Sequence, residues 1–201
     1  MTKQLQLTAL ILAGGRGMRM GGVDKGLVAL QHQRLVEHVL TRVRPQVDQI
    51  IISANRSLTQ YQDYGYPVLQ DQLEGFQGPL SGINEGLKHC TTDWLLVAPC
   101  DSPALPTDLA SRLGQAIEQQ QSRAAIAHDG RYLQPAFSLL HRELQPSLQA
   151  YLNAGGRKLG QWLHQQNPSI VDFSDQPDSF INLNSPEQLA QFQLQLKSPS
   201  E

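Results

Sequence analysis

The sequence has few cysteines, no long apolar run and no excess of basic charge. Its two cysteines, Cys90 and Cys100, are too few for a disulfide framework and do not form a Cys-x-x-Cys motif, so we expect two reduced thiols. The apolar run at 7–13 is far shorter than the roughly 20 residues of a membrane span, and the polar residues before it do not resemble a signal peptide. The formal net charge of -2 argues against a general nucleic-acid binder. We therefore expect a cytoplasmic protein with neither a membrane nor a nucleic-acid partner.

Short apolar runs alternate with helix-like segments along the 201 residues. Buried strands are predicted at 7–13, 49–53, 67–70 and 94–98, helices at 34–43, 80–87 and 105–119, a hairpin with strands at 124–127 and 135–140, and a final helix from Ser185-Pro186 through 192. Thr107 and Asp108 are the expected capping or acidic residues near the start of the third helix. The alternation predicts one α/β domain over residues 1–201, with a mostly parallel mixed sheet between two layers of helices.

In such a sheet, ligands bind beyond the carboxyl ends of the strands, so three loops should meet there. The first loop contains Gly14, Gly15, Arg16, Arg19 and Lys25. Glycines let backbone N–H groups approach a polyphosphate, and the basic side chains neutralise it; the alternative is a glycine-rich connection with solvated charges. The loop does not have P-loop spacing, and Met20 stands where a dinucleotide-binding motif needs its third glycine, so a Rossmann oxidoreductase fits poorly.

The loop after residue 98 offers one acidic side chain. Asp101 follows an apolar strand in the sequence Pro99-Cys100-Asp101-Ser102-Pro103. Magnesium takes one or two carboxylates and fills its remaining positions with substrate phosphates and water. Asp101 is therefore a candidate Mg²⁺ ligand beside the phosphate loop, and the alternative is a turn-forming aspartate.

The loop from Asp71 to Gly82 is long and begins with an aspartate at a strand end. A loop of this kind can present polar groups to the edge of a nucleotide base. An ordinary connection, whose Gly78-Pro79 starts the next helix, is the alternative reading.

Several blocks of the sequence together resemble the molybdenum cofactor guanylyltransferase family, and they cover nearly the whole chain. The blocks are Leu12-Ala13-Gly14-Gly15, Arg19-Met20-Gly21-Gly22-Val23-Asp24-Lys25, Ala54-Asn55-Arg56, Asp71, Gly78-Pro79-Leu80, Pro99-Cys100-Asp101, Val171-Asp172-Phe173-Ser174-Asp175 and Asn182-Leu183-Asn184-Ser185-Pro186-Glu187. The first block marks the wider nucleotidyltransferase superfamily, whereas its combination with the last two is narrow. The resemblance implies a three-layer, Rossmann-like nucleotidyltransferase fold, with a nucleotide-binding part at about 7–110 and an acceptor-binding part at about 120–195.

The resemblance also implies a reaction and a set of site residues. GMP is transferred from GTP to the terminal phosphate of molybdenum-bound molybdopterin, with Mg²⁺ as cofactor and pyrophosphate as the second product. The GTP contacts it implies, together with our own candidates, are Leu12, Ala13, Gly14, Gly15, Lys25, Ser53, Asp71, Gly78 and Asp101. Asp101 is the expected metal ligand, Lys25 and Arg19 are the expected phosphate clamps, and Asn182, Asn184 and Arg157 are candidates for the acceptor side.

Two details of the sequence bear on the nucleotide. Related cytidylyltransferases typically carry alanine where Gly14 stands, so Gly14 favours guanine. The family often has asparagine at position 53, where this chain has the shorter Ser53, and whether Ser53 or Asn55 contacts the nucleotide stays open.

Other functions remain as alternatives. A transferase of the same fold that uses another nucleotide, such as a cytidylyl or sugar-phosphate enzyme, would share Lys25 and Asp101. A non-catalytic GTP-binding module would bind the nucleotide and release no pyrophosphate. For the guanylyltransferase we expect a monomer that makes transient contacts with other cofactor-biosynthesis proteins and with acceptor molybdoenzymes.

Overall fold

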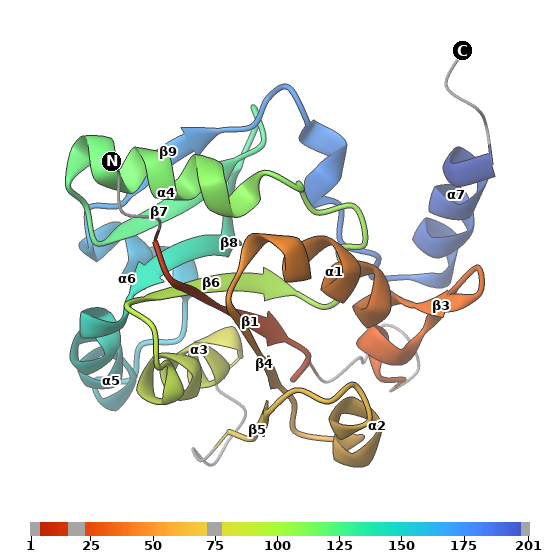
Figure 1. Cartoon of the computed structure of the whole chain (residues 1–201), viewed down its shortest axis with the longest axis horizontal. Helices are drawn as coiled ribbons and strands as arrows, with labels where there is room; N and C mark the ends of the chain where they lie inside the picture. Colours follow the sequence, from red (N-terminus) through yellow and green to blue (C-terminus); the bar gives the residue numbers. More distant parts are fainter. Residues whose placement is uncertain (1–4, 16–22, 72–77, 198–201) are drawn as a thin grey trace.

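A mixed seven-stranded sheet forms the centre of the molecule (Figure 1). The computed structural model describes residues 5–15, 23–71 and 78–197. The strand order is β5-β4-β1-β6-β8-β7-β9, and of these strands β8 alone runs antiparallel to its neighbours. The strands are β1 (Leu7–Leu12), β4 (Gln49–Ser53), β5 (Val68–Leu69), β6 (Trp94–Pro99), β7 (Ala124–His128), β8 (Leu133–His141) and β9 (Ser169–Asp172).

The central strands are mostly apolar because helices cover both faces of the sheet. In β1, Ala9 and Ile11 point into one core, and Leu10 points into the other. Ile52 and Ile51 of β4 divide in the same way. The alternation of side chains along a strand thus places one continuous apolar run into two separate cores.

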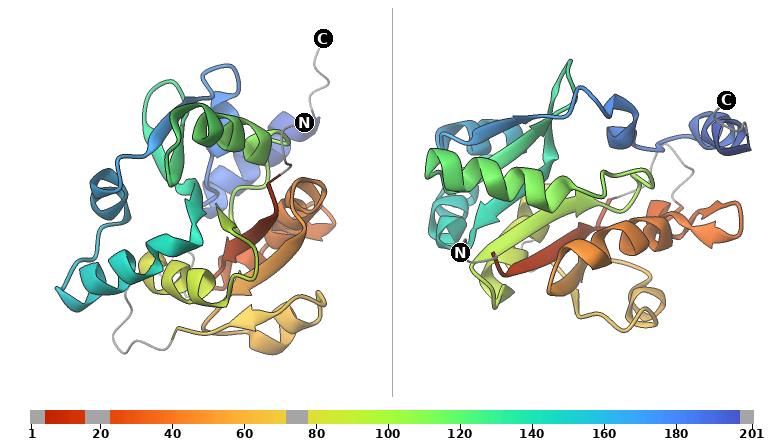
Figure 2. Two further views of the ribbon diagram at one scale, coloured as in Figure 1. Left: turned by 60° about the vertical axis from the view of Figure 1, so that its left-hand side comes forward. Right: turned by 45° about the horizontal axis from the view of Figure 1, so that its top comes forward.

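Helices α1 and α4 lie on one face of the sheet, and α3, α5 and α6 lie on the other (Figure 2). The helices are α1 (Leu35–Val43), α2 (Leu58–Gln62), α3 (Pro79–His89), α4 (Leu109–Gln120), α5 (Gln145–Asn153), α6 (Leu159–Gln165) and α7 (Pro186–Lys197). Short 3-10 turns are η2 (Lys25–Leu27), η3 (Arg44–Gln46), η4 (Arg142–Leu144) and η5 (Pro177–Phe180). The predicted three-layer arrangement with a mostly parallel mixed sheet is confirmed.

Helix α7 stands beside the sheet instead of covering it, next to the small hairpin of β2 (Ala29–Leu30) and β3 (Gln33–Arg34) (Figure 1). A third apolar cluster joins them, in which Leu183 and Phe192 pack with Leu30 and Leu35. The C-terminal segment is therefore attached to the part of the chain that follows the phosphate loop.

Two helix boundaries differ from the prediction. Helix α4 begins at Leu109 and not at 105, because Leu105 precedes Pro106 and a residue before proline disfavours the helical conformation. Asp108 occupies the capping position, but its side chain makes no capping hydrogen bond and instead lies 3.5 Å from Arg112. Helix α7 continues beyond 192 to Lys197, and the capping interaction at its start is present, since Ser185 Oγ accepts a hydrogen bond from the Gln188 N–H.

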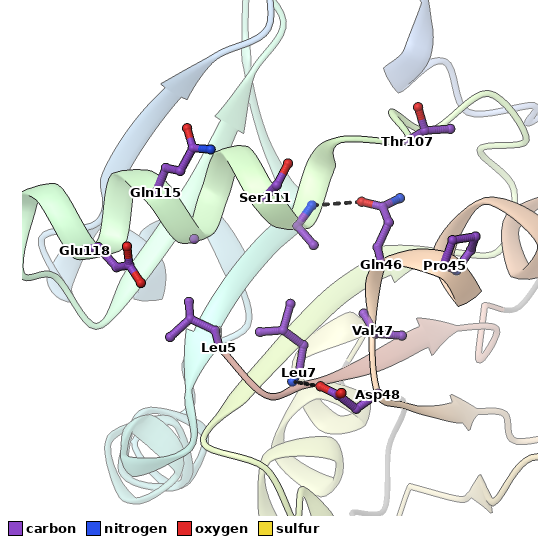
Figure 3. Close-up of a pocket in the computed structure, with 12 residues that line it drawn as sticks. Leu5, Leu7, Pro45, Gln46, Val47, Asp48, Thr107, Ser111, Gln115 and Glu118 are labelled. Atoms are coloured by element: carbon purple, nitrogen blue, oxygen red, sulfur yellow. Dashed lines mark hydrogen bonds between the residues drawn. The ribbon is translucent and has the colours of Figure 1, made fainter. Parts of the chain in front are cut away.

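A groove with a volume of about 620 Å³ opens at the amino end of β1, away from the carboxyl ends of the strands where the three predicted ligand loops begin (Figure 3). Its polar side chains brace the fold. Gln46 Oε1 accepts a hydrogen bond from the Ala110 N–H at 2.9 Å, and Asp48 Oδ2 accepts one from the Leu7 N–H at 2.7 Å. These two side chains therefore hold the elements around the groove together.

Candidate active site

The carboxyl ends of β1, β4 and β6 lie side by side, since Leu12 is paired with Ser53 on one side and with Pro99 on the other. Backbone hydrogen bonds continue past the strand ends. The Ala13 N–H donates to Ser53 O at 2.8 Å, and the Cys100 N–H donates to Leu12 O at 3.1 Å. The loops that carry the predicted phosphate and metal residues therefore leave the sheet from adjacent positions.

Lys25, Asp101 and Asn184 meet at this edge. Lys25 Nζ lies 3.4 Å from Asp101 Oδ2 and also donates a hydrogen bond to Asn184 Oδ1. The two charged side chains are 22% and 13% exposed, so the ion pair is largely screened from water yet still open to a ligand. Three segments far apart in sequence thus place a cation, an anion and an amide together.

The segment that carries Asn184 is held against the Asp101 loop. The Leu183 N–H donates to Asp101 O at 2.9 Å, and Ser102 Oγ donates to Asn182 Oδ1 at 2.5 Å. Both asparagines predicted for the acceptor side therefore border the predicted metal ligand.

Burial raises the pKa of Asp101 above its ordinary value, and the nearby Lys25 ammonium partly opposes that shift. The charged carboxylate is thus under-solvated in the free protein. A cation bound there would relieve this cost. Among the described residues no three histidine, cysteine or acidic side chains are grouped so that they could hold a metal ion, and the candidate donor here is the Asp101 carboxylate. That donor set fits Mg²⁺, which takes the rest of its oxygen ligands from substrate phosphates and water.

A second polar pair lies at the ends of β4 and β5. Asn55 Nδ2 donates to Asp71 Oδ2 at 2.8 Å, and the Asp71 N–H donates to Asn55 Oδ1 at 2.9 Å. Gly14 lies against this pair, because a Cβ at position 14 would come within 3.2 Å of Asn55 Nδ2. Gly14 and Asp71, both predicted to contact the nucleotide, are therefore joined through Asn55.

The comparisons with known proteins agree with this geometry. Residues 9–169 match the family described as MobA-like NTP transferase domain. A molybdenum cofactor guanylyltransferase from Shewanella frigidimarina is 49% identical over 191 residues, which cover 95% of this chain and 97% of that protein. The corresponding protein of Vibrio parahaemolyticus is 47% identical over 96% of this chain and 97% of its own. The chain belongs to the molybdenum cofactor guanylyltransferase family.

A solved structure shows the same fold. Molybdopterin-guanine dinucleotide biosynthesis protein A from Archaeoglobus fulgidus superposes with a TM-score of 0.80 at 23% identity, covering 94% of this chain and 98% of that one. At this identity the likeness is one of fold. As a family member the chain is a nucleotidyltransferase, and the resemblance inferred from its sequence blocks is confirmed.

The structure of this guanylyltransferase brings most of the predicted residues to one sheet edge, with two exceptions. Arg19 lies outside the described residues. Arg157 is exposed in the α5–α6 connection and donates to Leu152 O and Gly156 O. Ser53 lies at this edge, but its side chain is only 3% exposed and faces Gly82 of α3, where a Cβ would lie 2.4 Å from the Ser53 hydroxyl. Gly78 starts α3 with a φ of 65°, a conformation that favours glycine.

Two features were missed from the sequence of this guanylyltransferase. Asn55 is predicted from the sequence only as an alternative to Ser53 for contacting the nucleotide, and its pairing with Asp71 is not, because the two residues are 16 positions apart in the chain. The second is a buried hydrogen bond between Tyr61 and Asp24, the residue before Lys25. A buried acidic side chain needs a hydrogen-bond donor, so the acidic residue before the lysine of the phosphate loop is the signal that could have indicated such a donor.

Proposed function

We propose that this guanylyltransferase transfers GMP from GTP to the terminal phosphate of molybdenum-bound molybdopterin in a Mg²⁺-dependent reaction. The observation that carries the proposal is the meeting of Lys25, Asp101 and Asn184 at the carboxyl edge of the sheet. Family membership and the reaction in the names of the relatives support the choice of nucleotide and acceptor.

The chemistry follows from the charges of the reactants. A phosphate monoester with a second pKa near ~6 is already anionic at neutral pH, so it needs no general base. One of its oxygens attacks the α-phosphorus of GTP, the new P–O bond forms, and the bond to the β-phosphate oxygen breaks to release pyrophosphate. The protein must hold two anions in line and neutralise the leaving group.

Each named residue has a part in that task. Lys25 would bind phosphate oxygens, as would Arg19 by prediction. The backbone after β1, from Leu12 to Gly15, would approach the phosphates closely. Asp101 would hold Mg²⁺, which supplies charge neutralisation at the phosphates when it is bound. Asn182 and Asn184 lie where the acceptor phosphate has to arrive, and Arg157 remains a prediction for the pterin side.

The Asn55–Asp71 pair supports a role in choosing the base. Asp71 Oδ1 is buried and has no hydrogen-bond partner among the described residues, so it can accept from a donor on a ligand. Guanine presents N–H donors on its Watson–Crick edge, whereas adenine presents an acceptor at the corresponding ring nitrogen. We therefore expect GTP to be preferred over ATP by up to roughly 10⁴-fold in kcat/KM, since a mismatched base leaves buried polar groups unpaired.

The test is to mix the protein, Mg²⁺ and molybdopterin with GTP, CTP or ATP separately, and to search by mass spectrometry for the nucleotidyl product. A guanylylated pterin with equimolar pyrophosphate supports the proposal. A cytidylylated product favours the related transferase. GTP binding without pyrophosphate release favours a non-catalytic module, and equal kcat/KM for ATP and GTP removes the role of Asp71.

The setting of the reaction follows from the same proposal. No helix in the described part of the chain is long and apolar enough to cross a membrane. We retain the expectation of a cytoplasmic monomer that meets other cofactor-biosynthesis proteins and acceptor molybdoenzymes transiently, and of an acceptor-binding part at about 120–195. Light scattering with and without GTP tests the monomer.

A further inference from the structure

A buried polar network surrounds Asp24, the residue immediately before Lys25. Asp24, which is 7% exposed, accepts a hydrogen bond at 2.6 Å from the hydroxyl of Tyr61, whose side chain is fully buried. The other carboxylate oxygen of Asp24 lies 3.6 Å from Arg56 Nε, and Arg56 also donates to Val23 O at 2.9 Å. Arg56 and Tyr61, which both follow β4 in the chain, thus contact Asp24, the residue immediately before Lys25.

Asp24 and Lys25 belong to one tight turn. The Leu27 N–H donates to Asp24 O, and the Val28 N–H donates to Lys25 O, both at 3.1 Å. These bonds make η2 a single short unit, so fixing the Asp24 side chain also limits how far the Lys25 backbone can move.

The turn is pressed against both Tyr61 and the Asp101 loop. A Cβ at Gly26 would lie 2.5 Å from the Tyr61 hydroxyl and 3.1 Å from Cys100 Sγ. Only glycine permits this approach. Tyr61 therefore contacts the turn that carries Lys25 at Gly26, where the turn also meets Cys100, the residue before Asp101.

The Tyr61 hydroxyl is a permanent donor in this place. Burial, together with the nearby negative charges, raises the pKa of Tyr61 far above its ordinary value, so the phenol keeps its proton at any working pH. A buried carboxylate is costly unless it is hydrogen-bonded. Without the Tyr61 hydroxyl, Asp24 Oδ1 would lose this donor, and the turn that carries Lys25 would lose its side-chain hydrogen bond to α2.

We propose that Tyr61 is a positioning residue for Lys25: its hydrogen bond to Asp24 keeps that carboxylate engaged and holds η2 so that the Lys25 ammonium faces Asp101 and the triphosphate. The inference rests on the proposed nucleotidyl transfer, because it assigns Lys25 to the phosphates. It predicts that Tyr61 affects nucleotide binding only through Lys25.

The experiment is a double-mutant cycle on nucleotide binding, with Tyr61→Phe, Lys25→Ala and the pair, using Mg²⁺·GTP in the absence of acceptor. Loss of a hydrogen bond to a charged group should weaken binding by Tyr61→Phe about ten-fold. In the Lys25→Ala background the same substitution should have almost no further effect, since its route of action is gone. The matched control is Tyr64→Phe, which removes a hydroxyl that donates to Glu37 on the same side of the sheet.

Several results would overturn the inference. If the two losses simply multiply, or if Tyr61→Phe lowers the unfolding temperature while leaving the dissociation constant unchanged, then Tyr61 is a structural residue only. If Tyr61→Phe does not fold, Asp24→Asn replaces it in the cycle, and the same lack of additivity with Lys25→Ala is required. The dissociation constants of ATP and CTP are measured alongside that of GTP, and the cycle uses the nucleotide that binds most tightly. A preference for another base would then be detected separately from a failure of the Tyr61 inference.

Discussion

Replacing Asp101 by asparagine should separate activity from stability. The substitution keeps size and shape but removes the charge that a hard cation prefers. If the lost neutralisation is worth ~4 kcal/mol in the transition state, at about 1.36 kcal/mol per decade the turnover falls about 10³-fold. The assay is pyrophosphate release at saturating GTP across a Mg²⁺ titration.

The effect on stability has the opposite sign. At 3.4 Å the attraction between Lys25 and Asp101 is about 5 kcal/mol for an effective dielectric constant of about 20, before desolvation is counted. The pKa of Asp101 is nevertheless raised, so burial costs the carboxylate more than Lys25 returns. The folded protein therefore binds this proton more tightly than the unfolded chain. Ionised Asp101 lowers stability above the folded-state pKa, and this penalty fades as the pH falls toward the unfolded value near ~3.9.

We therefore expect Asp101→Asn to melt at an unchanged or higher temperature than the wild type at neutral pH, with the difference disappearing in acid. The matched control is Asp93→Asn, at the opposite end of β6, where the side chain is 66% exposed and lies 3.6 Å from Arg142. The control should leave turnover unchanged. Turnover of Asp101→Asn within a few-fold of wild type at low Mg²⁺, or a clear loss of stability at neutral pH, would refute the reasoning.

Two further substitutions follow from the packing and the charges. Lys25→Ala should raise KM for GTP and lower kcat, because the triphosphate loses a partly buried cation. Lys88→Ala, whose side chain is 51% exposed, should change neither value. Steady-state kinetics with varied GTP are the measurement, and wild-type values for Lys25→Ala would contradict the phosphate assignment. Gly82→Ala should destabilise the fold by roughly 1–3 kcal/mol, because the added methyl group would overpack against β4. The control is Gly160→Ala, whose Cβ would meet Pro135 at an ordinary 3.6 Å and which should be neutral or stabilising. Urea unfolding measures both. Equal midpoints for the two alanine variants would show that α3 moves freely.

The sheet could be predicted because its strands have local signals. Ile50, Ile51 and Ile52 alternate between two buried cores, so this part of β4 is an apolar run that the sequence shows directly. Strand β9 and helix α6 give weaker signals, since Ile170 is 47% exposed and α6 spans only seven residues. Their positions depend on packing against β7 and β8, which no local pattern encodes.

The site shows the same division. Lys25 and Asp101 could be predicted because each follows a recognisable strand or glycine-rich loop. The hydrogen bonds that organise them could not, since Tyr61 reaches Asp24 across 37 residues and Asn55 is paired with Asp71 only when β4 and β5 lie together. The sequence supplies the reacting groups, whereas tertiary packing decides which neighbours hold them.

The contact between Lys25 and Asn184 spans 159 residues of the chain. At about 5–20 residues per second, roughly 8–30 s pass on the ribosome between the synthesis of these two side chains. During that interval Lys25 and Asp101 are both present in the chain, but the Asn184 amide that accepts a hydrogen bond from Lys25 has not yet been made. The contact between Lys25 and Asn184 can therefore form only after nearly the whole chain has been synthesised, later than the contact between Lys25 and Asp101.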